Sequence, residues 1–128
     1  MKMMIRLIVA LFGLAFIGGG LAFAFVPLRI ATDFAVTTTA VAGLGTLRAD
    51  LGGLFLGVGC FMLAGLRAGK AFWLNVPLVV LGIVLVLRAL HLGMDGVTPE
   101  GMRSLVAEIV LVAVLFVARR VLSRDGVR

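Results

Sequence analysis

The sequence predicts an all-α integral membrane protein, a four-helix bundle whose two termini both face the cytoplasm. Hydrophobic residues make up 62% of the 128 residues and charged residues only 14%, which excludes an ordinary soluble domain. The apolar residues also gather into four segments separated by charged connectors, and each segment approaches the roughly 20 residues that a helix needs to cross a bilayer. We therefore expect a single transmembrane domain over residues 1–128.

The first expected span covers residues 7–26, a stretch without a charge that ends at Pro27. A cleavable secretory signal is the competing interpretation, because Ala22 and Ala24 resemble a small-residue cleavage site after a basic start. The apolar stretch is long for a signal core, and three further spans follow it. We therefore expect this segment to remain in the protein as a transmembrane helix.

The second span is expected at residues 48–66, after a connector over residues 28–46 that is apolar enough to lie on the membrane surface. Gly53 and Gly57 form a pair of small residues four apart, a pattern that lets membrane helices approach closely. We therefore expect a neighbouring helix to pack against these two glycines. The basic turn at residues 67–70 makes the second and third spans an antiparallel hairpin.

The third span is expected at residues 71–92, with Trp73 at a membrane interface and Pro77 within the first two turns, where a proline costs little. Thr98, Pro99 and Glu100 then resemble the start of a new helix, with threonine as the N-cap. The fourth span, residues 100–119, crosses only if Glu108 is carried into the membrane.

The basic residues predict the orientation, because cytoplasmic segments of membrane proteins carry an excess of lysine and arginine. Eight of the twelve fall in the N-terminal segment, the second connector and the C-terminal tail, namely Lys2, Arg6, Arg67, Lys70, Arg119, Arg120, Arg124 and Arg128. We expect a multi-pass protein of the bacterial inner (cytoplasmic) membrane. Since these residues lie at the ends of apolar segments rather than in a basic patch, no nucleic-acid partner is expected.

This orientation gathers the remaining charges at the outward end of the bundle. Arg48 and Asp50 open the second span, Arg88 and His91 close the third, and Glu108 lies about two and a half turns into the fourth. Because an unpaired charge inside a membrane is costly, we expect Arg88 and Glu108 to face the bundle interior and to pair. The predicted polar cluster consists of Arg48, Asp50, Arg88, His91, Asp95 and Glu108.

Two interpretations of this cluster stay open. Ion pairs can simply hold helices in register, which makes the cluster a structural lock. Alternatively, the same side chains form a binding site for a ligand or a partner. His91 with the nearby carboxylates offers few ligands for a metal, and the single cysteine, Cys60, excludes a thiolate cluster, so we expect no metal, no cofactor and no catalytic residue.

The sequence resembles a bacterial membrane family catalogued as domain of unknown function 4345, over most of its length. The residues that carry the resemblance are the Arg-Ala-Asp-Leu-Gly-Gly-Leu-Phe-Leu-Gly stretch at 48–57, Arg88-Ala89-Leu90, Met94-Asp95-Gly96, Pro99 and Glu108. His91 departs from the family pattern, in which a serine is common near the end of the third span. The resemblance implies four helices and a polar cluster but no activity, and a looser likeness extends to the small four-helix proteins of the DoxX type.

From these features we expect a non-enzymatic membrane protein whose outward polar cluster binds a small amphipathic ligand or a lipid, or docks a membrane complex. The alternative is a transporter or channel that works as a homo-oligomer and uses the same charged residues. A membrane enzyme acting on a lipid-soluble substrate is the third candidate.

Overall fold

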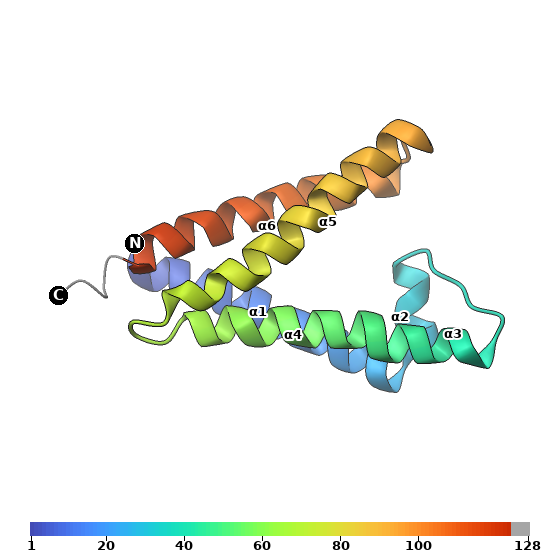
Figure 1. Ribbon diagram of the computed structural model, residues 1–128, viewed down its shortest axis with the longest axis horizontal. Coiled ribbons are helices and arrows are strands. Elements are labelled where there is room, and N and C mark those ends of the chain that lie inside the picture. Colours follow the sequence, from blue (N-terminus) through green and yellow to red (C-terminus); the bar gives the residue numbers. More distant parts are fainter. Residues whose placement is uncertain (124–128) are drawn as a thin grey trace.

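The computed structural model describes residues 1–123 and confirms the all-α class over that part of the chain (Figure 1). Its elements are the helices α1 (Lys2–Phe25), α2 (Pro27–Asp33) and α3 (Val41–Thr46), the π-helical turn η1 (Leu47–Leu51), α4 (Gly52–Gly65), the 3-10 turn η2 (Ala71–Leu74), α5 (Asn75–Met94) and α6 (Pro99–Ser123).

Three helical stretches are long and apolar enough to cross a membrane: Lys2–Phe25, Val41–Gly65 and Ala71–Met94. The fourth long helix, α6, has 25 residues and is not among them. Large hydrophobic side chains such as Leu11, Ile83 and Phe116 are exposed on the outer faces of the helices. A helix in water turns such residues inward, so this surface is suited to contact with lipid.

Each expected span overlaps one long helical stretch, but α1 already begins at Lys2 and α6 continues to Ser123. The second long helix begins at Val41 rather than near Arg48, because α3, η1 and α4 follow one another without a break. Arg48 and Asp50 therefore lie within a helical stretch, in a π-helical turn, instead of at its mouth. At α6, the Thr98 hydroxyl accepts a hydrogen bond from the Gly101 N–H at 3.0 Å, which confirms the predicted N-cap.

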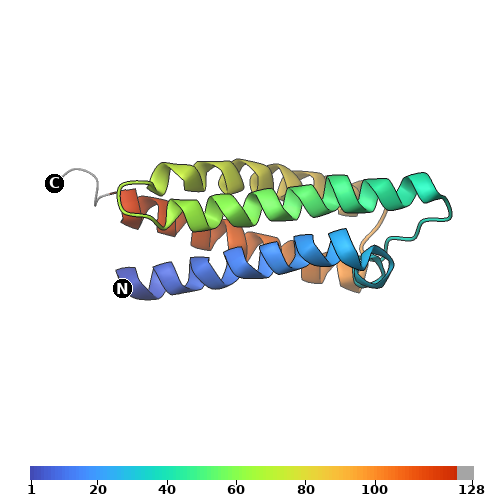
Figure 2. The same ribbon diagram turned by 90° about the horizontal axis from the view of Figure 1, so that it is seen from below.

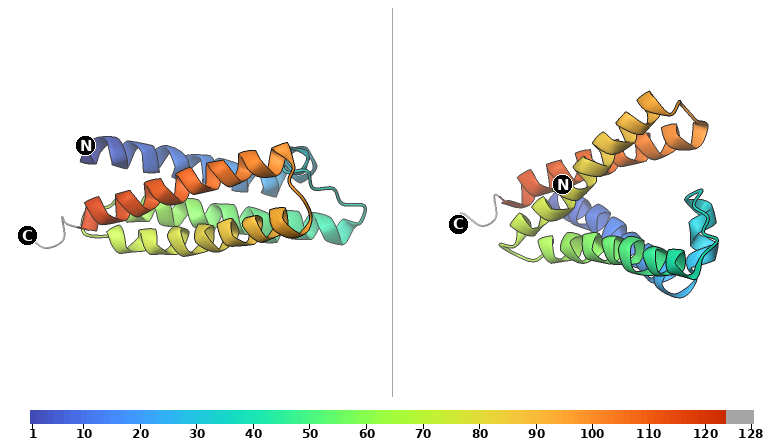
Figure 3. Two further views of the ribbon diagram at one scale, coloured as in Figure 1. Left: turned by 90° about the horizontal axis from the view of Figure 1, so that it is seen from above. Right: turned by 45° about the vertical axis from the view of Figure 1, so that its right-hand side comes forward.

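The long helices form two antiparallel pairs, α1 with α4 and α5 with α6. The pairs converge at one end of the molecule and diverge toward the other, so that they form a V in Figure 1 and in the right-hand view of Figure 3. Seen from below, all four run side by side along one axis (Figure 2). The largest group of buried side chains lies toward the converging end, where Val9, Met62, Leu74 and Leu115 have no exposed surface.

The start of α1 and the end of α6 lie together at the converging end (Figure 1). The turn at residues 67–70 is at the same end, whereas the connector at residues 34–40 and the turn after α5 are at the diverging end (Figures 1 and 2). The basic residues expected on one side, Lys2, Arg6, Arg67, Lys70, Arg119 and Arg120, accordingly belong to one end of the bundle. Arg124 and Arg128 lie outside the described residues.

Glycines bring α1 and α4 into close contact, but they are not the glycines predicted. A Cβ atom built at Gly59 would lie 2.7 Å from the Gly13 carbonyl oxygen, and one built at Gly20 would lie 2.9 Å from the Gly52 carbonyl oxygen. Each helix thus contributes two glycines seven residues apart, a spacing that returns to the same face after about two turns. The backbones touch because neither helix has a side chain there.

The packing predicted at Gly53 and Gly57 is not found within the described chain, since a Cβ at either position would meet no atom within 4 Å. The physical reason is helical rotation. Successive residues of an α-helix are turned by about 100°, so Gly52 and Gly53 point in different directions although they are neighbours in sequence. The correct face of α4 is the one that carries Gly52 and Gly59.

Candidate functional site

A cavity of about 500 Å³ lies between the two helix pairs, on the diverging side of the core. Phe12 and Phe16 of α1 and Phe55 of α4 line one wall, and Val80 and Val84 of α5 line the other. Its volume falls within the roughly 300–1,000 Å³ typical of small-molecule sites. The lining is predominantly apolar, so the cavity suits a hydrophobic molecule more than a stream of water or ions.

Aromatic rings form the wall next to the diverging end. The Phe16 and Phe55 rings are stacked with centroids 5.1 Å apart, and Phe34 from the connector meets Phe55 edge-on at 5.5 Å. Phe23, which is fully buried, completes the cluster from α1 at 5.3 Å from Phe34 and 5.5 Å from Phe55. These contacts hold α1, the connector and α4 together and present flat apolar surfaces to the cavity.

The predicted ion pair is present at the polar edge of this cavity. The Arg88 Nε donates a hydrogen bond to Glu108 Oε1 at 2.7 Å, which joins α5 to α6. The Glu108 side chain is 14% exposed and that of Arg88 is 32% exposed. The contact sets opposite charges within hydrogen-bonding distance, which offsets part of the cost of burying them.

The second carboxylate oxygen of Glu108 is different. Oε2 is buried and has no hydrogen-bond partner among the described residues, although a carboxylate oxygen accepts hydrogen bonds strongly. Glu108 itself is one of the residues that line the cavity. An unsatisfied buried acceptor costs about 1–3 kcal/mol, and it is therefore a place where a bound group would be stabilised.

Sequence reasoning missed several residues of this site. Ser104 lines the cavity one helical turn before Glu108. Ser104 precedes Glu108 by four residues, and because residues four apart share a helix face, this spacing predicts that the two side chains lie on the same side of α6. Phe16, Phe34 and Phe55 gave no such signal, since they come from segments far apart in the sequence.

The other members of the predicted cluster do not join the Arg88–Glu108 pair. His91, in the last turn of α5, and Asp95, just after that helix, contact each other at 2.7 Å between Nδ1 and Oδ2, and both are well exposed. Asp50 is exposed and makes no hydrogen bond or ion pair with the described residues. None of these three lines the cavity.

Arg48 has a separate contact. Its Nη1 donates a hydrogen bond to the Ala24 carbonyl oxygen near the end of α1. The last carbonyls of a helix lack partners within the helix, and a cation there also meets the negative end of the helix dipole. Arg48 therefore stabilises the end of α1 and ties it to η1, on the opposite helix pair from Arg88.

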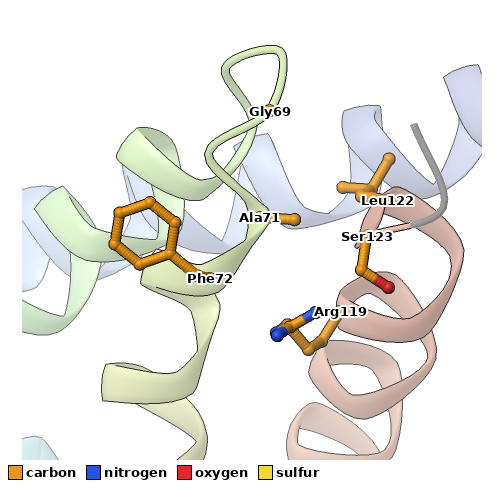
Figure 4. A pocket seen from close by; sticks show the side chains of 6 residues that line it. All are labelled: Gly69, Ala71, Phe72, Arg119, Leu122 and Ser123. Carbon is orange, nitrogen blue, oxygen red and sulfur yellow. The ribbon is translucent and has the colours of Figure 1, made fainter. Parts of the chain in front are cut away.

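A second, smaller cavity of about 170 Å³ lies at the converging end, between the turn before α5 and the end of α6 (Figure 4). Figure 4 shows Arg119 and Ser123 of α6 across from Ala71 and Phe72. The Arg119 Nε donates a hydrogen bond to the Asn75 Oδ1 at 2.9 Å, a link between α6 and α5 that sequence reasoning also missed. Over residues 1–123, no three side chains of His, Cys, Asp or Glu are grouped closely enough to hold a metal ion.

No family model, curated protein or solved structure matches this chain. The class of protein is thus defined by the helices themselves: a small all-helical membrane-type chain with three helices long and apolar enough to cross a bilayer and a cavity between two helix pairs. Membership of the family with domain of unknown function 4345 stays a prediction based on the residues quoted above.

Proposed function

We propose that this protein is a four-span protein of the bacterial inner membrane, with both termini in the cytoplasm, that binds a small amphipathic molecule in the cavity between its two helix pairs. The observation that carries the proposal is the cavity of about 500 Å³ with apolar walls and one charged edge. An apolar pocket with a few convergent polar groups is the usual form of a small-molecule site.

The membrane part of the proposal is supported by exposure and charge. The outer surfaces of α1, α5 and α6 carry large hydrophobic residues, including Leu14, Leu87 and Val110. If α6 crosses the membrane, Glu108 lies within it, and the pairing with Arg88 offsets the free-energy cost of placing a charge there. The basic residues at the converging end favour a cytoplasmic position for that end.

Binding is favoured over passage through the chain. A channel or transporter path has to continue from one end of the bundle to the other. Toward the converging end, however, Met62, Leu74 and Leu115 are fully buried and pack together in the core. In this single chain the cavity is therefore blocked by side chains at one end, as expected for a site that holds a molecule.

The test is to place a larger side chain in the cavity and to measure whether a bound molecule is lost. Ala107 lines the cavity, whereas Ala113 on the same helix does not, and both residues are exposed. Native mass spectrometry of protein released from membranes should show a co-purified species on the parent and on Ala113→Phe. Its occupancy should fall about tenfold in Ala107→Phe, which requires a Kd at least tenfold weaker, or a loss of at least about 1.4 kcal/mol of binding free energy.

The opposite result has a clear meaning. If the parent carries no small molecule and binds none that is added, or if Ala107→Phe carries as much as Ala113→Phe, the cavity is not a binding site. The Arg88–Glu108 pair is then a structural lock between α5 and α6.

A further inference from the structure

At the polar edge of the cavity, one buried hydrogen-bond acceptor has no partner among the described residues. Arg88 and Glu108 neutralise each other through the 2.7 Å contact between Nε and Oε1. The buried Oε2 of Glu108 remains, and it only accepts. The Ser104 hydroxyl on the same helix face both donates and accepts. Among the buried side-chain atoms at this edge, Oε2 is the one without a hydrogen-bond partner in residues 1–123, and as an acceptor it needs a donor.

The charge at this edge disfavours an anionic head group. The positive charge of Arg88 is already matched by Glu108, so a carboxylate or phosphate entering the cavity would bring a second negative charge beside the first. Like charges in a water-poor site repel strongly and lose their hydration. A neutral group that carries an O–H satisfies the acceptor without adding charge.

The walls favour a flat apolar body next to that head group. The Phe16 and Phe55 rings are stacked with centroids 5.1 Å apart and planes inclined by 26°, and both line the cavity with Phe12 and Phe34. Aromatic rings pack well against further rings in stacked or edge-on arrangements. A ring with a hydroxyl at one end and an alkyl chain at the other matches both the walls and the edge.

We propose, on the basis of the binding function proposed above, that the cavity selects a neutral amphiphile with a hydroxylated ring as its polar end, and that this hydroxyl donates a hydrogen bond to Glu108 Oε2. The ring lies among the phenylalanines and the alkyl part follows the apolar lining. Compounds of the same shape that lack the O–H, and compounds with an anionic head group, bind more weakly.

The test compares two probes that differ only in the donor: 4-nonylphenol and its methyl ether, 4-nonylanisole. Binding to the full chain in detergent is followed by native mass spectrometry, with Ala107→Phe measured in parallel to subtract probe associated with the micelle. We expect the phenol to bind about tenfold more tightly than the ether, the size of effect that a single hydrogen bond to a charged acceptor produces.

A change of Glu108→Gln tests the assigned acceptor. The amide oxygen can keep the contact with Arg88, and an NH₂ group, a donor, then takes the place of Oε2. The preference for the phenol over the ether should fall from about tenfold to about twofold or less, or reverse. Glu100→Gln is the matched control, because Glu100 is an exposed carboxylate of the same helix that pairs with Arg103 outside the cavity. It should keep the full preference.

Each outcome decides one of the two proposals. Equal binding of phenol and ether to the parent chain, with both lost in Ala107→Phe, would overturn the donor inference and leave the binding site in place, with water as the partner of Oε2. Absence of binding by either probe and of any co-purified species would overturn the binding function as well. A preference that persists in Glu108→Gln would show that Glu108 is not the acceptor. If Glu108→Gln does not fold, the comparison of the two probes on the parent chain decides alone.

Discussion

At the scale of single residues, the contact between Arg88 and Glu108 joins α5 to α6 inside the apolar part of the bundle. Arg88→Met should lower the free energy of unfolding by about 3 kcal/mol, because Glu108 then stays buried without a counter-charge. Glu108→Gln should cost less, since the amide is neutral and still bonds Arg88. The double variant should recover part of the summed loss. The measurement is a double-mutant cycle from denaturation of the purified protein in detergent.

The matched control for this cycle is the pair formed by Glu100 and Arg103, three residues apart and exposed on α6. Exposed pairs contribute about 0–1 kcal/mol, so a cycle on Glu100 and Arg103 should give little coupling. Strictly additive losses for Arg88 and Glu108 would mean that their 2.7 Å contact does not contribute to stability.

At the scale of helices, the contact between α1 and α4 depends on which glycines face the partner. A Cβ at Gly59 would lie 2.7 Å from the Gly13 carbonyl oxygen and 2.9 Å from the Ile17 nitrogen, atoms of a backbone that cannot rotate away. Gly59→Ala should therefore destabilise the protein by about 2 kcal/mol through overpacking. The measurement is the thermal midpoint in detergent.

Gly57→Ala is the control on the same helix, because its Cβ would meet no atom within 4 Å. Alanine is favoured over glycine inside a helix by about 1 kcal/mol, so this variant should be as stable as the parent or more so. A loss at Gly57 equal to that at Gly59 would show that a partner outside this chain covers the Gly57 face.

At the scale of the whole molecule, the position of α6 decides whether the chain crosses the membrane three or four times. Single cysteines at Thr38, Val97 and Ser123, in a Cys60→Ala background, report the membrane side of the connector before α3, of the turn after α5 and of the end of α6. With four crossings, Thr38 and Val97 should label from the periplasmic side of intact cells, and Ser123 only after the membrane is opened. If Val97 and Ser123 label from the same side, α6 lies along the surface.

Cys60→Ala is needed in that experiment because Cys60 is a free and exposed thiol. Alanine is a small residue like cysteine, so the helix is expected to tolerate the change. A label at Thr38 that requires opened membranes, together with free labelling at Ser123, would reverse the orientation and contradict the assignment from basic residues.

The sequence by itself determined the elements that depend on neighbouring residues. Apolar length located the helices, Pro27 marks the end of α1, and Thr98 caps α6. Counting residues from the turn between α5 and α6 also predicted that Arg88 and Glu108 lie at a similar depth, because both helices meet at that turn. The positions of the basic residues predicted which helix ends lie at the same end of the bundle.

Only the tertiary structure decided the relations between distant segments. Whether Gly53 or Gly52 faces α1 depends on the rotation of α4 about its axis, which packing against α1 sets. The divergence of the two helix pairs places Arg48 on the end of α1 and leaves it apart from Arg88, and it opens the cavity that Phe16, Phe55 and Glu108 line. The physical reason is that helix periodicity is a local property, whereas the angle between helices results from the fit of side chains contributed by the whole chain.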